Sequence, residues 1–210
     1  MDSNTPLSFF PAPIVHNWLH HKPRKSLKKG EYIMSPTDEK RVYLLTEGTA
    51  QLFHIHPDGK ECVIDLLKPG EAIGLLEIFS EREAKRFARA LTPVEVIPLL
   101  TTEVKQVITD HPSLAFQLLH YVTEQLEETI DILEQVAYGK VEERLLFLLY
   151  KLTSTAESKE GYSLLPDYLT HRDLAGMIAS TRETVTFIMN KWLHEGVIME
   201  KEHRLWIKKN

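Results

Sequence analysis

Residues 169–196 read LTHRDLAGMIASTRETVTFIMNKWLHEG, a pattern typical of two helices joined by a tight turn. The Thr170 hydroxyl and the Asp173 carboxylate, three residues apart, are typical of a helix start because each side chain can bind the other residue's backbone N–H. One apolar face at helical spacing follows, formed by Leu174, Met177 and Ile178. Small residues on the same helix, Ala175 and Gly176, allow a second helix to pack closely, so the stretch predicts a helix-turn-helix.

The second helix would be capped by Ser180 or Thr181 and would end at Gly196. Its buried face is expected from Val185, Ile188, Met189 and Trp192. Its exposed side would carry Arg182, Glu183, Thr186, Asn190 and Lys191. The first residues of such a helix enter the major groove, where Arg can bind guanine and Glu can accept from cytosine. The alternative is a solvated helix with an ordinary charge pair.

Two short strands, residues 197–200 and 205–208, follow the second helix and predict a β-wing. The run STRETVTFIMNKWLHEGVI at 180–198 resembles the recognition helix and wing of the Crp/Fnr family of bacterial transcription regulators. The resemblance implies that Arg182 and Glu183 contact bases. The full set expected at DNA is Thr170, His171, Ser180, Thr181, Arg182, Glu183, Thr186, Phe187, Asn190, Lys191 and Arg204.

Phe187 occupies the position, one turn along the recognition helix, where the family commonly has a second Arg. A phenyl ring cannot donate to guanine, but it can pack against a thymine methyl. Burial of Phe187 against the first helix, beside Val185 and Ile188, is at least as well supported by the sequence. Both alternatives stay open here.

Composition is ordinary for a soluble globular protein: 210 residues, 43% hydrophobic and 26% charged. No apolar run approaches the roughly 20 residues needed to span a bilayer, and the start lacks the features of a secretion signal. We therefore expect a cytoplasmic protein without a membrane partner. A single cysteine, Cys62, excludes an internal disulfide and a Cys-ligated iron–sulfur cluster built by one chain.

The formal net charge of −5 is unevenly distributed. Residues 1–138 carry a net −6, whereas residues 139–210 carry a net +1 and three further histidines. The C-terminal part can therefore approach phosphates, although it is not strongly basic. We expect DNA affinity to depend on two copies binding together and to fall with salt.

Short strands separated by turn signals extend from Ser26 to Leu100, after a short helix expected over residues 14–21. The order of Glu47-Gly48, Pro57-Asp58-Gly59-Lys60 and Lys68-Pro69-Gly70-Glu71 resembles the β-roll of the cyclic-nucleotide-binding domain, the sensor part of the same family. Neighbouring His20 and His21 on the short helix are expected to be solvated rather than to bind metal, because neighbouring side chains point apart on a helix.

The resemblance also implies where an effector would bind. Members that bind cyclic AMP carry a Gly-Glu pair and, later, an Arg-Ser pair; here Leu75 replaces the Glu, and Ala84-Lys85 replaces Arg-Ser. A Thr-Ser pair on the long helix is half lost, as Thr129-Ile130. We therefore expect no cyclic AMP binding and assign no cofactor. The nearby cations Arg82, Lys85 and Arg86 could still bind another anion. The expected pocket comprises Gly74, Leu75, Leu76, Arg82, Lys85, Arg86, Thr129 and Ile130.

His54, His56 and Cys62 lie around one predicted hairpin. With a two-residue turn beginning at Asp58, Cys62 would pair opposite Ile55 and face away from His54. That arrangement does not suit a three-ligand metal site, so we expect exposed histidines and a small buried thiol.

Residues 113–137 predict one long helix. Residues recur at spacings of four and three, as in a coiled-coil seam, and all but Thr129 are apolar. The seam is Ala115, Leu119, Val122, Leu126, Thr129, Leu133 and Val136. Glutamates and an aspartate flank this narrow stripe, so we favour a parallel homodimer over the core helix of a monomer. Tyr138-Gly139-Lys140 is interpreted as a hinge before a second apolar helix over 141–152. A polar loop over 153–161 and a short strand within 162–169 would follow.

The predicted architecture is therefore α+β in three parts: a β-roll sensor (1–112), a dimerisation helix (113–137) and a winged helix-turn-helix (138–210). The resemblance implies a transcription regulator that binds a palindromic DNA operator as a homodimer, with RNA polymerase as a partner if it activates. No catalytic constellation is found, so an enzyme hidden in the β-roll has no candidate residues. An alternative is a cyclic-nucleotide-responsive module whose winged helix is a protein-interaction surface.

Overall fold

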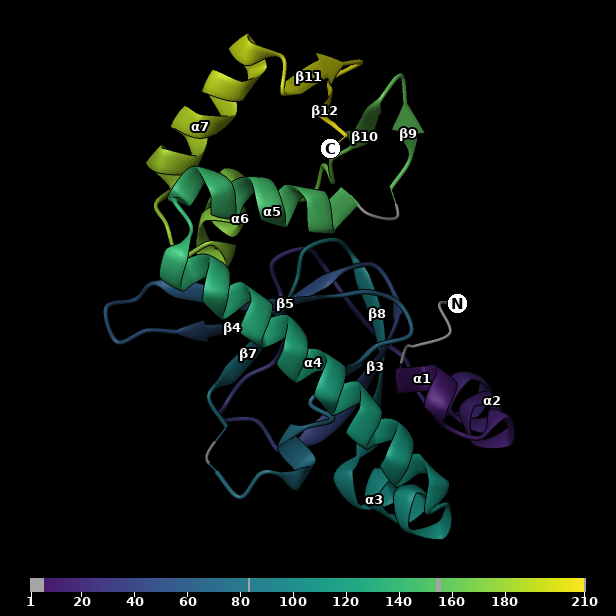
Figure 1. The fold of residues 1–210 in the computed structure, drawn as a ribbon. Helices are drawn as coiled ribbons and strands as arrows, with labels where there is room; N and C mark the ends of the chain where they lie inside the picture. Colours follow the sequence, from purple (N-terminus) through teal and green to yellow (C-terminus); the bar gives the residue numbers. More distant parts are fainter. Residues whose placement is uncertain (1–5, 83, 154–155, 210) are drawn as a thin grey trace. The chain divides into compact units, whose positions relative to one another are not determined.

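The computed structural model describes residues 6–82, 84–153 and 156–209 and divides into two compact units, residues 1–128 and 129–210 (Figure 1). In the described part of the first unit, two antiparallel four-stranded sheets form a β-roll with strand orders β1-β8-β3-β6 and β2-β7-β4-β5. The strands are β1 Lys25–Leu27, β2 Tyr32–Met34, β3 Arg41–Glu47, β4 Ala50–Ile55, β5 Glu61–Leu67, β6 Ala72–Ile73, β7 Arg86–Ala90 and β8 Val94–Leu100. The predicted β-roll is therefore confirmed.

Helices surround one side of the β-roll core. They are α1 Pro6–Phe9, α2 Ala12–His21, the 3₁₀ turn η1 Glu77–Phe79, α3 Thr101–Asp110 and the first part of α4 Ser113–Tyr138. Trp18 of α2, 1% exposed, packs in one apolar cluster with Leu114 and Leu118 of α4. The helix predicted over 14–21 is confirmed within α2, whereas α1 and α3 were not predicted.

The turn between β3 and β4 requires glycine. Gly48 has φ +80°, and a Cβ at this position would overlap the Pro93 carbonyl oxygen. Any side chain would therefore collide with the neighbouring backbone, and the close approach of these two turns explains the Glu47-Gly48 signal in the sequence.

The β4–β5 hairpin differs from the prediction in register. The His56 N–H binds the Lys60 carbonyl at 2.8 Å, which encloses a three-residue loop with Gly59 at φ +78°. The longer loop shifts the pairing by one residue, so Cys62 lies opposite His54 rather than Ile55. Cys62 is also exposed, not buried as expected. Nevertheless, within the described residues no group of three or more His, Cys, Asp or Glu side chains could hold a metal ion.

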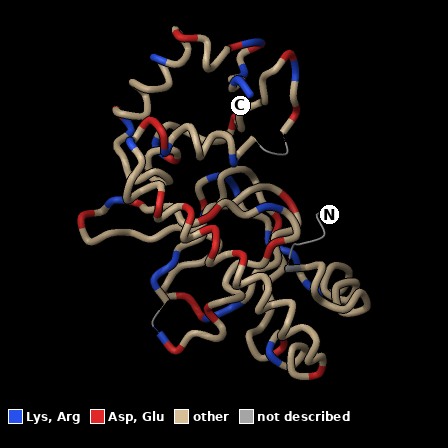
Figure 2. Tube along the Cα trace, viewed as in Figure 1, with Lys and Arg blue, Asp and Glu red and all other residues tan. Residues whose placement is uncertain are grey.

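The long helix α4 confirms the helix predicted over 113–137. Leu114 and Leu118 face the β-roll core, but much of the remaining apolar surface is exposed in the single chain. The exposed fractions along the predicted seam are 62% for Leu119, 38% for Val122, 58% for Leu126, 64% for Leu133 and 38% for Val136. The helix carries acidic residues but no Lys or Arg, as its red segments show in Figure 2.

The second unit contains a winged helix-turn-helix, as predicted. Its elements after α4 are α5 Val141–Thr153, β9 Ser158–Lys159, β10 Tyr162–Leu164, α6 His171–Met177, α7 Arg182–Glu195, β11 Ile198–Lys201 and β12 Arg204–Lys208. In the described residues the strands form one antiparallel sheet ordered β11-β12-β10-β9. Strand β9 lies in the segment predicted as a polar loop. Strand β9 is short and exposed, so no local hydrophobic pattern predicts it. It is a strand because its backbone pairs with β10.

The core of this unit joins the three helices to the wing. Leu145 and Leu149 of α5 are at most 1% exposed and belong to one apolar cluster with Val185 of α7 and Ile207 of β12. The break before α5 falls at Gly139 and Lys140, and the Lys140 N–H donates to the Glu143 carboxylate at 2.7 Å. Across the described part of the chain, no helix is long and apolar enough to span a bilayer.

Candidate nucleic-acid interface

Helix α6 begins with the capping box that the sequence predicted. The Asp173 N–H donates to Thr170 Oγ1 at 3.2 Å, and the Thr170 N–H donates to Asp173 Oδ2 at 2.8 Å. The Thr170 hydroxyl also donates to Asp173 Oδ2 at 2.6 Å. These bonds satisfy two N–H groups at the helix start and hold Thr170 at an exposed position.

The turn between α6 and α7 has a strained residue at its centre. Ala179 has φ +51°, a left-handed conformation that costs an L-residue about 1–2 kcal/mol. The Ser180 N–H binds the Ala175 carbonyl at 2.9 Å, which closes the turn. Thr181, not Ser180, then caps α7 by accepting the Thr184 N–H at 3.2 Å.

Helix α7 presents one apolar and one polar side. Val185, Ile188, Met189 and Trp192 are buried, as predicted. Arg182, Glu183 and Asn190 are exposed. The exposed start therefore carries the Arg-Glu pair expected to contact bases, on a helix held by its cap and its apolar face.

Phe187 is 70% exposed, so of the two alternatives the burial of Phe187 against the first helix is wrong. Each residue turns an α-helix by about 100°, which places Phe187 about 200° from Val185 and opposite the buried face. Val185 and Ile188, the apolar neighbours of Phe187 in sequence, therefore lie on the buried side of α7, whereas Phe187 lies on the exposed side. The phenyl ring lies on the same exposed side as Glu183 and Asn190.

His171 links the first turn of α6 to α7. The Thr186 hydroxyl donates to the Arg182 carbonyl at 2.9 Å, so its oxygen accepts from His171 Nδ1, also at 2.9 Å. Burial, and next the nearby Arg182 charge, lower the pKa of His171 below its usual value of 6.5. At neutral pH the ring is therefore uncharged and carries its proton on Nδ1.

Lys191 is held within its own unit. Its Nζ lies 2.8 Å from Glu142 Oε1 at the start of α5, and the same oxygen accepts the Trp192 indole N–H at 2.9 Å. The Lys191 hydrogen bond is the main cause that lowers the pKa of Glu142, and Glu142 in turn raises the pKa of Lys191. This contact orients α7 against α5. The sequence did not single out Glu142, because the two partners are far apart in the chain.

The wing turns sharply at Glu202 and His203. Their φ angles are +55° and +59°, so both central residues adopt the conformation that a tight two-residue hairpin requires. Lys201 forms an ion pair with Glu160 at 3.5 Å, whereas Arg204, at the start of β12, is exposed. The wing thus places one exposed arginine at its tip.

Four of the predicted effector residues, Leu76, Arg82, Lys85 and Arg86, line one cavity of the β-roll. This cavity, of about 210 Å³, is lined by Lys40, His54, Leu76, Glu77, Ser80, Arg82, Ala84, Lys85 and Arg86. Leu75, only 2% exposed, instead belongs to the apolar core with Trp18, and Gly74 lies under the Arg41 backbone. Thr129 and Ile130 are exposed on the part of α4 that falls in the second unit.

The cavity carries an excess of positive charge. Arg86 pairs with Glu77 at 3.4 Å, and Lys40 donates to the Ser80 carbonyl at 3.1 Å. Burial, followed by the Arg86 and Lys85 charges, lowers the pKa of His54. Lys40 and His54 were not predicted here, since they come from other segments of the chain and no local motif connects them to the Arg82 loop.

Comparisons with known proteins match the two units separately. The family model "Cyclic nucleotide-binding domain" matches residues 24–111, and the model "Crp-like helix-turn-helix domain" matches residues 143–209. The global nitrogen regulator of Synechocystis is 28% identical over 176 residues, which cover 82% of this chain and 78% of the relative. A CRP-like cAMP-activated global transcriptional regulator of Mycobacterium tuberculosis is 26% identical, over 75% of this chain and 71% of the relative.

Solved structures show the same fold. A c-di-GMP responsive global regulator of Xanthomonas campestris superposes with a TM-score of 0.80 at 18% identity, covering 95% of this chain and all of the other. A CRP/FNR-family transcriptional regulator of Thermus thermophilus has a TM-score of 0.67 at 27% identity, covering 88% and 93% of the two chains. The two family models occur in the predicted order, and the relatives are named as regulators, not as enzymes. The chain belongs to the Crp/Fnr family of transcription regulators.

Proposed function

We propose that the protein regulates transcription by binding a palindromic operator as a homodimer, with α7 of each copy in the major groove of one half-site. The observation that carries this proposal is the exposed start of α7. There Arg182 and Glu183 project from a helix that is capped by Thr181 and held by its buried apolar face. Arg182 is suited to guanine and Glu183 to cytosine. The exposed Arg204 at the wing tip suits a phosphate contact beside the groove.

The dimer proposal rests on α4. Its seam residues, Leu119, Val122, Leu126, Leu133 and Val136, are 38–64% exposed in the single chain, and burying such a stripe against an identical helix would be favourable. Acidic residues and no basic residue flank the stripe, which disfavours burial on both sides. We assign residues 113–137 to dimerisation, between the sensor (1–112) and the DNA-binding part (138–210).

We further propose that the β-roll senses a small anion other than cyclic AMP. Arg82, Lys85 and Arg86 line the 210 Å³ cavity, and Glu77 supplies a single countercharge among its lining residues. The Mycobacterium tuberculosis relative is named as cAMP-activated, but this chain has a buried Leu75 and Ala84-Lys85 at the two positions where such proteins carry their polar anchors. If the regulator activates transcription, RNA polymerase is its further partner.

A protein-interaction role for the winged helix is the competing proposal, and the exposed Phe187 is the observation that favours it. DNA binding to genomic fragments, measured by gel shift at a stated salt concentration, separates the two. Arg182→Ala is expected to cost about 1–3 kcal/mol per half-site and to relax preference at one base pair. The charge-matched control Lys105→Ala, on α3, should bind normally. If the unaltered protein retains no fragment, the interaction role is favoured instead.

A further inference from the structure

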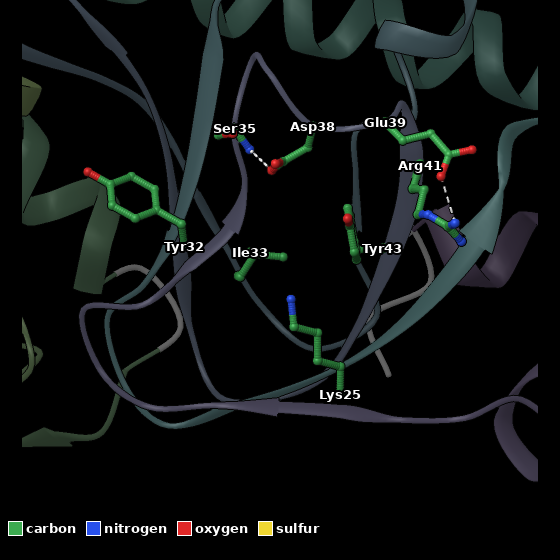
Figure 3. Close-up of a pocket in the computed structure, with 8 residues that line it drawn as sticks. All are labelled: Lys25, Tyr32, Ile33, Ser35, Asp38, Glu39, Arg41 and Tyr43. Atoms are coloured by element: carbon green, nitrogen blue, oxygen red, sulfur yellow. Dashed lines mark hydrogen bonds and ion pairs between the residues drawn. The ribbon is translucent and has the colours of Figure 1, made fainter.

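A second cavity of the β-roll, of about 460 Å³, shares no lining residue with the effector cavity. It is formed by β1, β2, β3 and the loop over residues 35–40, and Figure 3 shows the side chains that line it. Neither the family resemblance nor the proposed regulator function assigns a role to it. Its lining combines two tyrosines with acidic and basic groups.

Lys25 provides a positive charge within this cavity. Lys25 and Leu27 share one face of β1, and Leu27 is buried in the β-roll core, so the Lys25 stem is directed along the inner face of the sheet. Figure 3 shows the side chain extending from β1 towards Ile33 and Tyr43. Among the described residues, the Lys25 ammonium forms no hydrogen bond or ion pair.

Asp38 provides a negative charge in the same cavity. Its Oδ2 accepts the Ser35 N–H at 2.7 Å, and its own N–H binds the Ser35 carbonyl at 3.1 Å, so a tight turn orients the carboxylate. No basic group in the described part of the chain pairs with it. By contrast, Glu39 and Arg41 neutralise each other across 2.7 Å.

Tyr43 lines the same cavity as these two charges. It is 7% exposed, and burial together with Asp38 raises the pKa of its hydroxyl, so the phenol stays protonated and can donate a hydrogen bond. Asp38 and Tyr43 both line this cavity, as Figure 3 shows. The lining therefore contains one unpaired cation, one unpaired carboxylate and a phenol donor, with no net charge.

We propose that this cavity binds an α-amino acid, whose carboxylate pairs with Lys25 and whose ammonium pairs with Asp38. A ligand that carries both charges complements Lys25 and Asp38, whereas a nucleotide or phosphate would leave its charge facing the unpaired Asp38 carboxylate. The loop over residues 35–40 also contributes Lys40 to the effector cavity, so an amino acid held by Asp38 would contact a segment shared by the two sites.

The experiment measures thermal unfolding of the full-length protein with each of the twenty common L-amino acids, followed by calorimetric titration of those that raise the Tm. We expect one or a few to bind, and their N-acetyl and amide derivatives, each lacking one charge, to lose at least roughly tenfold in affinity. Lys25→Met and Asp38→Asn should each cause a similar loss. Lys28 is exposed, directly follows Leu27 in the chain and does not line the cavity, so the matched control Lys28→Met should bind normally.

Asp38→Asn keeps an oxygen that can accept the Ser35 N–H, so it separates loss of charge from loss of the turn. The proposal is overturned if no amino acid raises the Tm of the unaltered protein, or if Lys25→Met and Asp38→Asn bind as well as the control. Equal binding of an N-acetyl derivative would identify a simple carboxylate site and overturn it as well. Because DNA is absent from the assay, none of these results bears on operator binding.

Discussion

The Lys191 ammonium lies 2.8 Å from the Glu142 carboxylate, so the recognition helix α7 is tied to α5 by a residue that the sequence assigned to DNA. Glu142 also accepts the Trp192 indole N–H at 2.9 Å, which anchors the buried side of α7 at the same point. The ion pair places the Lys191 charge where a phosphate contact would have to compete with a carboxylate.

Lys191→Ala is therefore expected to leave the salt dependence of operator binding unchanged and to lower the Tm slightly. Glu142→Gln should release the ammonium and steepen the plot of log K against log salt by about 1, because one more counterion would then be displaced. Binding titrations across a salt series measure both slopes. A slope that is shallower by about 1 in Lys191→Ala would show that Lys191 is a phosphate contact after all.

Phe187 should select an A·T pair at the base step under it, because its exposed ring can pack against a thymine methyl but cannot donate to guanine. Selection of binding sites from a random DNA pool measures this preference. Phe187→Arg should shift the preference at that step to a G·C pair and leave the pair under Arg182 unchanged. Enrichment of G·C by the unaltered protein would exclude the thymine contact without affecting the Arg182 prediction.

Leu126→Asp should separate the dimer. Leu126 is 58% exposed on the seam of α4, so the fold of the single chain should tolerate the substitution. In the dimer, however, the substitution places a charge in the helix interface of both copies, at a cost of several kcal/mol. Analytical ultracentrifugation should find monomers, and operator affinity should collapse as the two half-sites are no longer linked. Glu127→Ala, one residue off the seam, is the control, and a Leu126→Asp protein that remains dimeric would refute the seam.

Cyclic AMP at about 1 mM should neither raise the Tm nor change operator affinity, because a ligand stabilises the native state only if it binds that state. Two substitutions remove the groups that would hold the nucleotide. Leu75, buried in the core, stands where the Glu would be needed, and Ala84-Lys85 stands where the Arg-Ser pair would be needed. Differential scanning fluorimetry with and without the nucleotide checks this. A rise of several degrees would mean that other groups of the cavity hold the nucleotide.

Glu71→Gln should flatten the pH dependence of stability between pH 4.5 and 7. Burial raises the Glu71 pKa from 4.5 to about 7; Asp65 and Glu128 add to this effect, while the Lys68 N–H opposes it. In this window the folded state therefore binds more protons than the unfolded state, and stability falls as pH rises. The shift from 4.5 to about 7 corresponds to about 3 kcal/mol.

Urea unfolding of both proteins at pH 5 and pH 7.5 measures the effect of Glu71, because other titrating groups are common to the two. We expect the unaltered protein to lose stability relative to Glu71→Gln as the pH rises. An identical pH dependence in the two proteins would mean that the Glu71 carboxylate is better solvated than its position after the Lys68–Gly70 turn indicates.

Local signals were sufficient for the regular elements. The capping pair Thr170 and Asp173, and the helical spacing from Val185 to Trp192, involve residues within one or two turns of each other, so the sequence predicted α6, α7 and the buried face of α7 correctly. The same holds for the length of α4, whose heptad spacing is a local property. Resemblance to the Crp/Fnr family then connected these elements to a function.

Features that depend on register or on distant segments required the tertiary structure. One additional loop residue before Lys60 shifts the register by one, so Cys62 lies opposite His54 rather than Ile55. Because side chains alternate between the two faces of a sheet, a shift of one residue also changes the face on which Cys62 meets its partner. Leu75 and Arg82 are close in sequence, yet one entered the core and the other the cavity.

By itself, then, the sequence determined the order of the β-roll, long helix and winged helix, since hydrophobic periodicity and capping act over a few residues. Only the tertiary structure decided that Lys191 faces Glu142, that Phe187 is exposed and that Lys25, Asp38 and Tyr43 line one cavity. Each of these outcomes depends on how separate segments pack together, and packing brings together side chains that no local pattern relates.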